Sequence, residues 1–331
     1  MMNKGAAVWT VRLLLAVLFI FGGEILLWTS IQQYTAVDWL IRLIGYPVLA
    51  VLILDLAARY RIRDIYDAMV LFALYGLLVG LLITPTVSLV NFPYSILTRV
   101  LGGHTLLGFE MWGFLLVLTA GNKRRYQLLL VGIAAWLGFY WGIWLRWIPE
   151  FGMLFEAVSI ESALMIAGIF FAMIVILAGF AFRVRHDLKP LDFRLPNAQW
   201  ILFFLVFVGL YAYQSISHHV TVWMLLVVAF LLVVCWAILW YRREDEGATL
   251  LDSHFPVQIP LSLFWMIFSA GIFSAMAILS FQLPLVGTGE YNQLWLMEMG
   301  FGTVGTLWLP LVASVLAIRG VDYQMRTGQL R

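Results

Sequence analysis

Charged residues are scarce in this sequence, and their scarcity excludes a soluble globular protein. Asp, Glu, Lys and Arg make up 11% of the 331 residues, whereas soluble domains carry about 25%. Hydrophobic residues make up 63%. A soluble fold of this size needs a polar surface that this composition cannot supply. We therefore expect the lipid bilayer to be a partner that covers much of the exterior.

The sequence also lacks the motifs of several enzyme and binding classes. Cys235 is the one cysteine, so neither an intramolecular disulfide nor a thiolate metal site is expected. No phosphate-binding loop, HExxH zinc pair or nucleophile elbow is present. The basic residues are spread over several short connections, which gives no support to nucleic-acid binding. We predict no catalytic residue, metal or cofactor, and we favour a function other than an enzyme.

Long apolar runs fill most of the sequence instead. A helix needs about 20 apolar residues to cross the hydrocarbon core of a bilayer. Ten such runs predict an all-α, polytopic transmembrane bundle, and they lie at Ala7–Trp28, Trp39–Ala58, Ile65–Thr84, His104–Ala120, Tyr126–Leu145, Val158–Phe182, Trp200–Ser215, Val220–Tyr241, Ile259–Gln282 and Leu294–Ile318.

The distribution of Lys and Arg predicts the orientation of the bundle. Arg99 and Arg146 lie on one set of connections, and sixteen basic residues lie on the alternating set and the two termini. Basic connections stay on the cytoplasmic side, so both termini are predicted to be cytoplasmic, as in a prokaryotic-type inner membrane. Arg12 and Arg42 lie near the ends of their runs, where a long side chain can extend to the headgroups.

We expect reporter fusions to reproduce this alternation. Fusions after Arg125 and at Arg331 should report a cytoplasmic location, and a fusion near Trp147 should report an external one, because the basic asymmetry requires an even number of crossings. Enzymatic reporters that are active on only one side of the membrane measure this directly. An external C-terminus would contradict the ten-helix topology.

The connections are too short to hold a soluble domain. The longest ones predicted on the basic side, Arg183–Gln199 and Arg242–Gln258, are each about 17 residues, which cannot bury a core of their own. Residues 1–331 therefore form one membrane domain. Ten crossings also permit two five-helix halves of opposite orientation, 1–145 and 146–331, although the two halves show no convincing sequence repeat.

Prolines and glycines interrupt the segment between the third and fourth runs, Pro85–Gly103. Its mixture of apolar and polar residues favours an amphipathic helix that lies in the outer interface. The alternative is a re-entrant segment that is buried against protein. In neither case is it predicted to form a full crossing.

Small residues mark the places where helices can approach closely. The pairs Gly76 and Gly80, and Gly138 and Gly142, are each separated by one helical turn, and further glycines lie in the tenth run. Such spacing gives a flat face for another helix. Packing within the chain is the favoured interpretation. A moving surface, a protein partner and a homo-oligomer are the alternatives.

Ionisable residues inside the runs are the candidates for a functional site. A carboxylate near the midplane is costly and usually faces protein or a wet cavity. Glu110 lies roughly 15 Å from the cytoplasmic edge, and Glu24 lies roughly 24 Å from it. Glu298 and His104 lie nearer the outer side. These four residues are the candidate intramembrane proton, cation or polar site, and Glu110 is expected to face protein or trapped water.

Two alternatives remain open for these side chains. Glu110 is either a protonated, hydrogen-bonded structural residue or a proton or cation site. His104 precedes it by six residues, roughly 600° of helical rotation, so the two should point to different sides. A haem held by outer-side histidines, such as His104 with His218 or His219, is not favoured, because these residues do not form a recognisable ligand pair.

Three classes of function fit these observations. A secondary transporter or permease with a carboxylate inside the membrane is the first. An accessory or structural subunit of a larger membrane complex is nearly as well supported, because the loops are short and aromatic residues are abundant. A membrane-embedded enzyme that acts on lipids is third.

Overall fold

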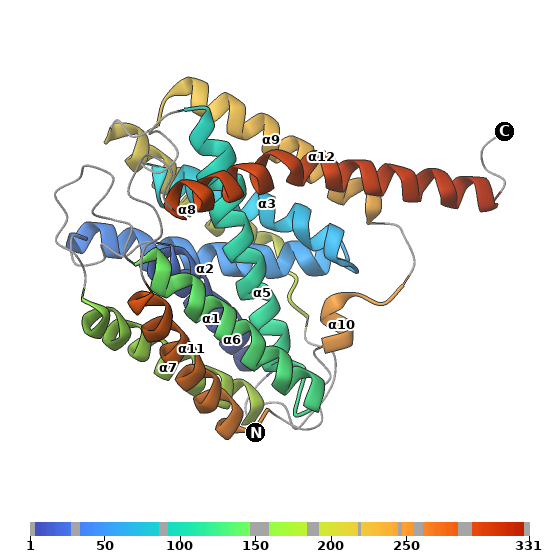
Figure 1. The fold of residues 1–331 in the computed structure, drawn as a ribbon. Helices are drawn as coiled ribbons and strands as arrows, with labels where there is room; N and C mark the ends of the chain where they lie inside the picture. The colour runs from blue at the N-terminus through green and yellow to red at the C-terminus, as the bar shows by residue number, and fades with distance from the viewer. Residues whose placement is uncertain are drawn as a thin grey trace.

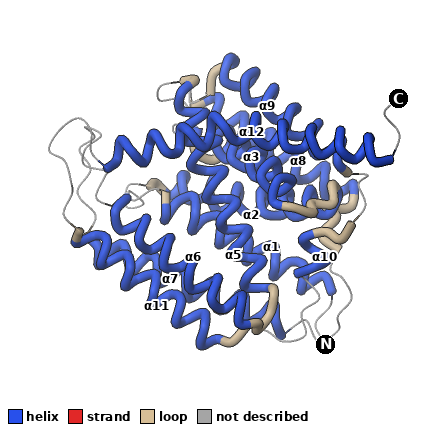
Figure 2. The backbone as a smooth tube through the Cα atoms, turned by 45° about the vertical axis from the view of Figure 1, so that its right-hand side comes forward, coloured by secondary structure: helices blue, strands red, loops and turns tan. Residues whose placement is uncertain are grey.

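The computed structural model describes residues 4–27, 34–85, 92–145, 159–183, 192–217, 220–243, 247–254, 261–283 and 293–327. Within these residues the chain is helical, without strands. The helices pack into one bundle, and the C-terminal end of α12 extends away from it (Figures 1 and 2).

Ten segments of the described residues are long and apolar enough to cross a membrane, which confirms the predicted transmembrane bundle. The elements are α1 (Lys4–Ile20), η1 (Phe21–Leu26), α2 (Ala36–Arg59), α3 (Ile65–Leu82), η3 (Ile96–His104), α5 (Thr105–Thr119), α6 (Arg124–Trp144), α7 (Ile160–Arg183), α8 (Asn197–Ile216), α9 (Val222–Arg242), the short α10 (Leu250–His254), α11 (Leu263–Gln282) and α12 (Gln293–Thr327). The first span combines α1 with η1, and the fourth combines η3 with α5.

The first four spans form the centre of the bundle. Between 67% and 78% of their residues are buried, compared with 11–33% in the last six spans. The exposed faces of the outer helices carry large apolar side chains, for example Phe204 on α8 and Phe230 on α9. Such faces fit contact with lipid. Burial inside the bundle is therefore concentrated where the polar residues of η1, α2 and η3 lie.

Local sequence signals begin the central helices. The Thr35 side chain accepts a hydrogen bond from the Asp38 backbone, and the Asp38 side chain accepts one from the Thr35 backbone, so α2 begins with a capping box. Asp64 caps α3 by accepting from the backbones of Tyr66 and Asp67. Pro47 lies inside α2, as is tolerated in membrane helices, where neighbouring groups satisfy the freed carbonyl.

The fourth span begins earlier than the sequence predicted. We expected it to start at His104, with Pro85–Gly103 outside the crossing, but Ile96–His104 forms a π-helix that continues into α5. This segment contacts α3 and α12, and most of its side chains are buried, so the interfacial interpretation is wrong for residues 96–103. Gly102 allows the approach, because a Cβ there would overlap the Phe301 carbonyl oxygen of α12. Residues 86–91 lie outside the described part.

Glycines also bring α6 close to α11 and contribute to the contact between α12 and η3 from the α12 side. A Cβ on Gly138 or Gly142 of α6 would overlap a carbonyl oxygen of α11, and a Cβ on Gly305 of α12 would overlap the Leu97 carbonyl oxygen of η3. Gly76 of α3 faces Thr105 in the same way. These glycines pack within the chain, as favoured. Contact with a protein partner or a second copy stays a prediction.

Candidate functional site

A buried carboxylate lies where the first two spans meet. Glu24, in η1, is 0% exposed. Its Oε1 accepts a hydrogen bond from the Tyr46 hydroxyl at 2.7 Å, and its Oε2 accepts from Arg42 Nε at 2.8 Å and from the Tyr34 hydroxyl at 2.6 Å. Three side chains on two segments of the chain thus converge on one carboxylate. We call Glu24, Tyr34, Arg42 and Tyr46 the Glu24 cluster.

Arg42 is the cation of this cluster. Its side chain is 8% exposed, so it does not extend to the headgroups as the sequence suggested. The Asp38 carbonyl accepts a hydrogen bond from Nη1, and the guanidinium stacks 3.7 Å from the centre of the Tyr34 ring. Burial and the neighbouring Glu24 carboxylate raise the pKa of Tyr34, which keeps its hydroxyl protonated as a donor. The cluster is therefore closely hydrogen-bonded around one carboxylate and one guanidinium.

The carboxylate lies on an irregular segment of the first span. Gly22 and Gly23 precede it, and residues Phe21–Leu26 adopt the wider π-helical turn. A Cβ on Gly23 would overlap the Tyr46 hydroxyl, so this glycine admits the donor. Two indoles of α6 satisfy carbonyls near the end of the segment, because Trp141 donates to the Ile25 oxygen and Trp144 donates to the Leu27 oxygen. π-helical turns often mark functional sites.

His104 lies close to the same cluster, at the end of the second π-helical segment. Its side chain is 1% exposed, and its Nε2 is 3.4 Å from the Thr84 hydroxyl. The Arg42 guanidinium lies within electrostatic range of the ring. Nδ1 has no hydrogen-bond partner among the described residues, although it is buried. Two predicted site residues, Glu24 and His104, are thus brought to one region.

Glu110 lies apart from the Glu24 cluster. It is half-buried on α5, in the neighbourhood of the Trp136 and Tyr140 side chains of α6. His104 contacts Thr84 instead, so the two residues face different neighbours, as their spacing predicted. The side chain of Glu298 lies outside the described residues, and so do His218 and His219. A proton or cation role for Glu110 stays a prediction.

Sequence reasoning missed Arg42, Tyr34 and Tyr46 as members of the site. A signal was available, because Glu24 lies four residues before the end of its run and Arg42 lies three residues after the start of the next. In antiparallel neighbouring helices both side chains then lie about 5 Å inside the same end. Opposite charges at equal depth in consecutive spans predict an ion pair.

A second ionic cluster lies at the opposite ends of the central helices. Arg242 of α9 pairs with Asp64 and Asp67 at the start of α3, and Arg319 of α12 pairs with Asp64 at 2.8 Å. Asp67 is 2% exposed. This cluster joins α3, α9 and α12 at the arginine-rich end of the bundle. The two ends of the central helices are therefore stabilised by separate sets of ion pairs.

Side chains that could ligate a metal ion do not gather in the described part of the chain. No group of three His, Cys, Asp or Glu side chains comes together there to hold a metal ion. No protein-family model matches the chain, and no curated protein or solved structure is significantly similar to it. The functional argument therefore rests on the geometry of the Glu24 cluster.

Proposed function

We propose that this protein is a secondary transporter that moves a small acidic solute together with a proton through the Glu24 cluster. The observation that carries the proposal is a buried Glu24–Arg42 ion pair that joins the irregular η1 to α2 in the centre of the bundle. Transporters commonly bind substrate where membrane helices are interrupted. Here both η1 and η3 are irregular, and both contribute an ionisable side chain to this region.

The pair supplies a means of coupling. Glu24 forms an ion pair with Arg42. A solute carboxylate can therefore bind the guanidinium only after this ion pair has broken. Protonation of Glu24 removes its charge and weakens the pair, and Arg42 then binds the acidic group of the solute. Guanidinium groups suit this step because they bind carboxylates with two parallel hydrogen bonds. One proton thereby accompanies one acidic group.

The contacts between helices support a plan of two halves, 1–145 and 146–331. The first, second and third spans each contact the span that lies five positions later, α7, α8 and α9 respectively. The contact between the fourth and tenth spans, η3 with α12, corresponds to the one between the ninth and fifth, α11 with α6. Both of these close contacts place glycine against a carbonyl. Exchange of the two halves therefore exchanges these particular contacts, as expected of inverted repeats, whereas the packing of α1 against α2 and of α3 against α5 belongs to the first half alone.

The two ionic clusters support alternating access. A transporter must close one side of its site before it opens the other, and charge pairs at helix ends can form and break during such a movement. The Glu24 cluster holds one end of α2, and the Asp64, Asp67, Arg242 and Arg319 cluster holds α3, α9 and α12 at the other. The structure has both sets of contacts formed.

Proton uptake into proteoliposomes tests the proposal. A pH-sensitive dye inside the vesicles is read after the addition of monocarboxylates, dicarboxylates, amino acids and uncharged sugars to the outside. We expect one acidic class to drive proton uptake with the wild-type protein. Glu24→Gln should lose this uptake but retain exchange of the labelled solute, because Arg42 is then free without a proton.

The exposed Arg125 is the matched control for a charge change. Arg125→Met should behave as wild type, since Arg125 lies outside the Glu24 cluster. Folded wild-type protein that gives no solute-driven uptake across the panel would contradict the proposal, as would Glu24→Gln with full proton coupling. A stoichiometric partner that co-purifies with an inactive protein would favour a complex subunit instead.

A further inference from the structure

A short segment before α8 is buried at the arginine-rich end of the bundle. Residues 192–195 have no regular secondary structure, and connections of this kind normally run over the surface. Here the side chains of Phe193 and Leu195 are buried instead. Phe193 is part of the main core, and Leu195 packs against α2. We call residues 192–195 the strap.

Charged side chains of α1 and α2 bind the backbone of the strap. Arg12 of α1 donates a hydrogen bond from Nη2 to the Phe193 oxygen at 3.2 Å. Asp55 of α2, which is 0% exposed, accepts one from the Leu195 N–H at 2.6 Å. Arg59 pairs with Asp55 and donates to the Leu195 oxygen at 3.4 Å. The strap belongs to the second half of the chain, and it thereby joins two helices of the first half.

The strap and the Glu24 cluster lie toward opposite ends of the same two helices. Arg12 precedes Glu24 by 12 residues, and Asp55 follows Arg42 by 13, so about 18–20 Å of helix separates the two sets of contacts. At one end, Glu24 and Arg42 join the first span directly to α2. At the other end, the strap joins α1 to α2 through its backbone. Separation of the two helices at either end therefore requires one of these sets to break.

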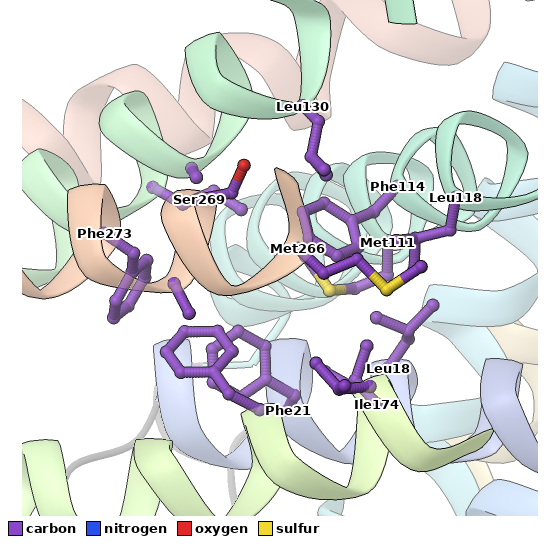
Figure 3. A pocket seen from close by; sticks show the side chains of 15 residues that line it. Leu18, Phe21, Met111, Phe114, Leu118, Leu130, Ile174, Met266, Ser269 and Phe273 are labelled. Atoms are coloured by element: carbon purple, nitrogen blue, oxygen red, sulfur yellow. The ribbon is translucent and has the colours of Figure 1, made fainter. Parts of the chain in front are cut away.

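The first span has adaptable packing on a face that does not contact α2. Leu18 of α1 and Phe21 of η1 border an apolar pocket between α1, α5, α6, α7 and α11 (Figure 3). No described residue of α2 lines this pocket. Met111 and Met266 lie on its other walls, and thioether side chains adapt readily to a change of shape. A movement of α1 relative to α2 can be accommodated there.

We propose that the strap is the gate at the arginine-rich end, which holds α1 and α2 together and releases when the protein opens its site to that side. The proposal rests on the transport function proposed above. Hydrogen bonds suit a gate because Arg12, Asp55 and the strap backbone can exchange one another for water at a small net cost. Alternating access then requires the strap to be bound more tightly whenever the Glu24 cluster is open.

Hydrogen exchange of the Leu195 amide tests the gate. Purified full-length protein in mild detergent is diluted into deuterated buffer, and fragmentation mass spectrometry follows the amide. Its N–H is bound to a buried carboxylate, so exchange requires release of the strap. Asp55→Asn should speed exchange roughly ten- to hundredfold, the effect of losing a charge-assisted hydrogen bond. Asp252→Asn is the matched control and should leave the rate unchanged, because this exposed carboxylate binds Thr249 instead.

Glu24→Gln separates a gate from a fixed anchor. The change weakens the Glu24 cluster, so a gate should be bound more tightly, and exchange at Leu195 should slow by about fivefold or more, the lower limit of usual coupling between sites. A fixed anchor predicts no slowing, because loss of one charge from a buried pair destabilises the protein. Thermal unfolding shows whether each variant is folded, and if Asp55→Asn is not, Glu24→Gln decides alone.

Unchanged or faster exchange at Leu195 in Glu24→Gln would overturn the gate, as would folded Asp55→Asn with the wild-type rate. The measurement needs no solute, so its result is separate from the proton-uptake assay. Failure of uptake together with slower exchange in Glu24→Gln would reject the acidic solute and retain the movement of the strap.

Discussion

Replacement of Arg42 by methionine is expected to lower the free energy of unfolding by about 3–5 kcal/mol, the usual cost of removing one partner from a buried ion pair. The loss is large because Glu24 is 0% exposed and cannot regain water in place of the guanidinium. The change also removes the stacking of Arg42 on Tyr34. Unfolding in mixed micelles with increasing SDS, followed by circular dichroism, measures the difference.

A double variant tests whether the loss comes from the unpaired carboxylate. Glu24→Gln together with Arg42→Met should lose less stability than the sum of the two single variants, by roughly 1–3 kcal/mol, because neither charge is then left alone. Arg125→Met serves as the exposed control and should change stability by less than about 0.5 kcal/mol. Strict additivity would show that Glu24 and Arg42 do not stabilise each other.

Replacement of Gly138 by valine is expected to cost at least about 3 kcal/mol, the upper end of the range for overpacking. Its Cβ would overlap the Phe273 carbonyl oxygen of α11, and a backbone atom cannot rotate away as a side chain can. The helices must separate, and the neighbouring contact of Gly142 with α11 is then lost too. The same SDS unfolding assay measures the effect.

Gly132 provides a control on the same helix. No atom lies within 4 Å of a Cβ built there, so Gly132→Val should change stability by about 0.5 kcal/mol or less. Equal losses at Gly132 and Gly138 would mean that helix propensity, and not the approach of α11, explains the effect. The comparison therefore isolates the close packing of α6 against α11.

Composition and apolar runs were sufficient to predict the class of fold. Each of the ten predicted runs overlaps one of the ten described spans, because the thickness of the hydrocarbon core imposes one length on every crossing. The main misjudged boundary was the start of the fourth span. Pro85, Pro93, Gly102 and Gly103 favoured an interfacial helix for this segment, whereas α12 and α3 bury Ile96–His104. Contacts with distant helices override local propensity at such positions.

The candidate site was only partly visible in the sequence. Glu24 and His104 were identified because ionisable groups inside an apolar run are costly wherever they lie. Glu110 was the main candidate because of its depth, yet the structure places it near the Trp136 side chain and away from the Glu24 cluster. The depth of a residue in the membrane indicates how costly its charge is. It does not indicate which neighbouring side chains offset that cost.

The sequence by itself determined that this chain crosses the membrane as a helical bundle, since each apolar run has the length that a helix needs to cross and a helix satisfies its own backbone groups in lipid. It also determined the spacing of the crossings. The tertiary structure decided which helices are central, and it brought Arg42, Tyr34 and Tyr46 around Glu24. Whether a segment enters the lipid depends on its own sequence. Which side chains meet between helices depends on how the helices are rotated and tilted against one another.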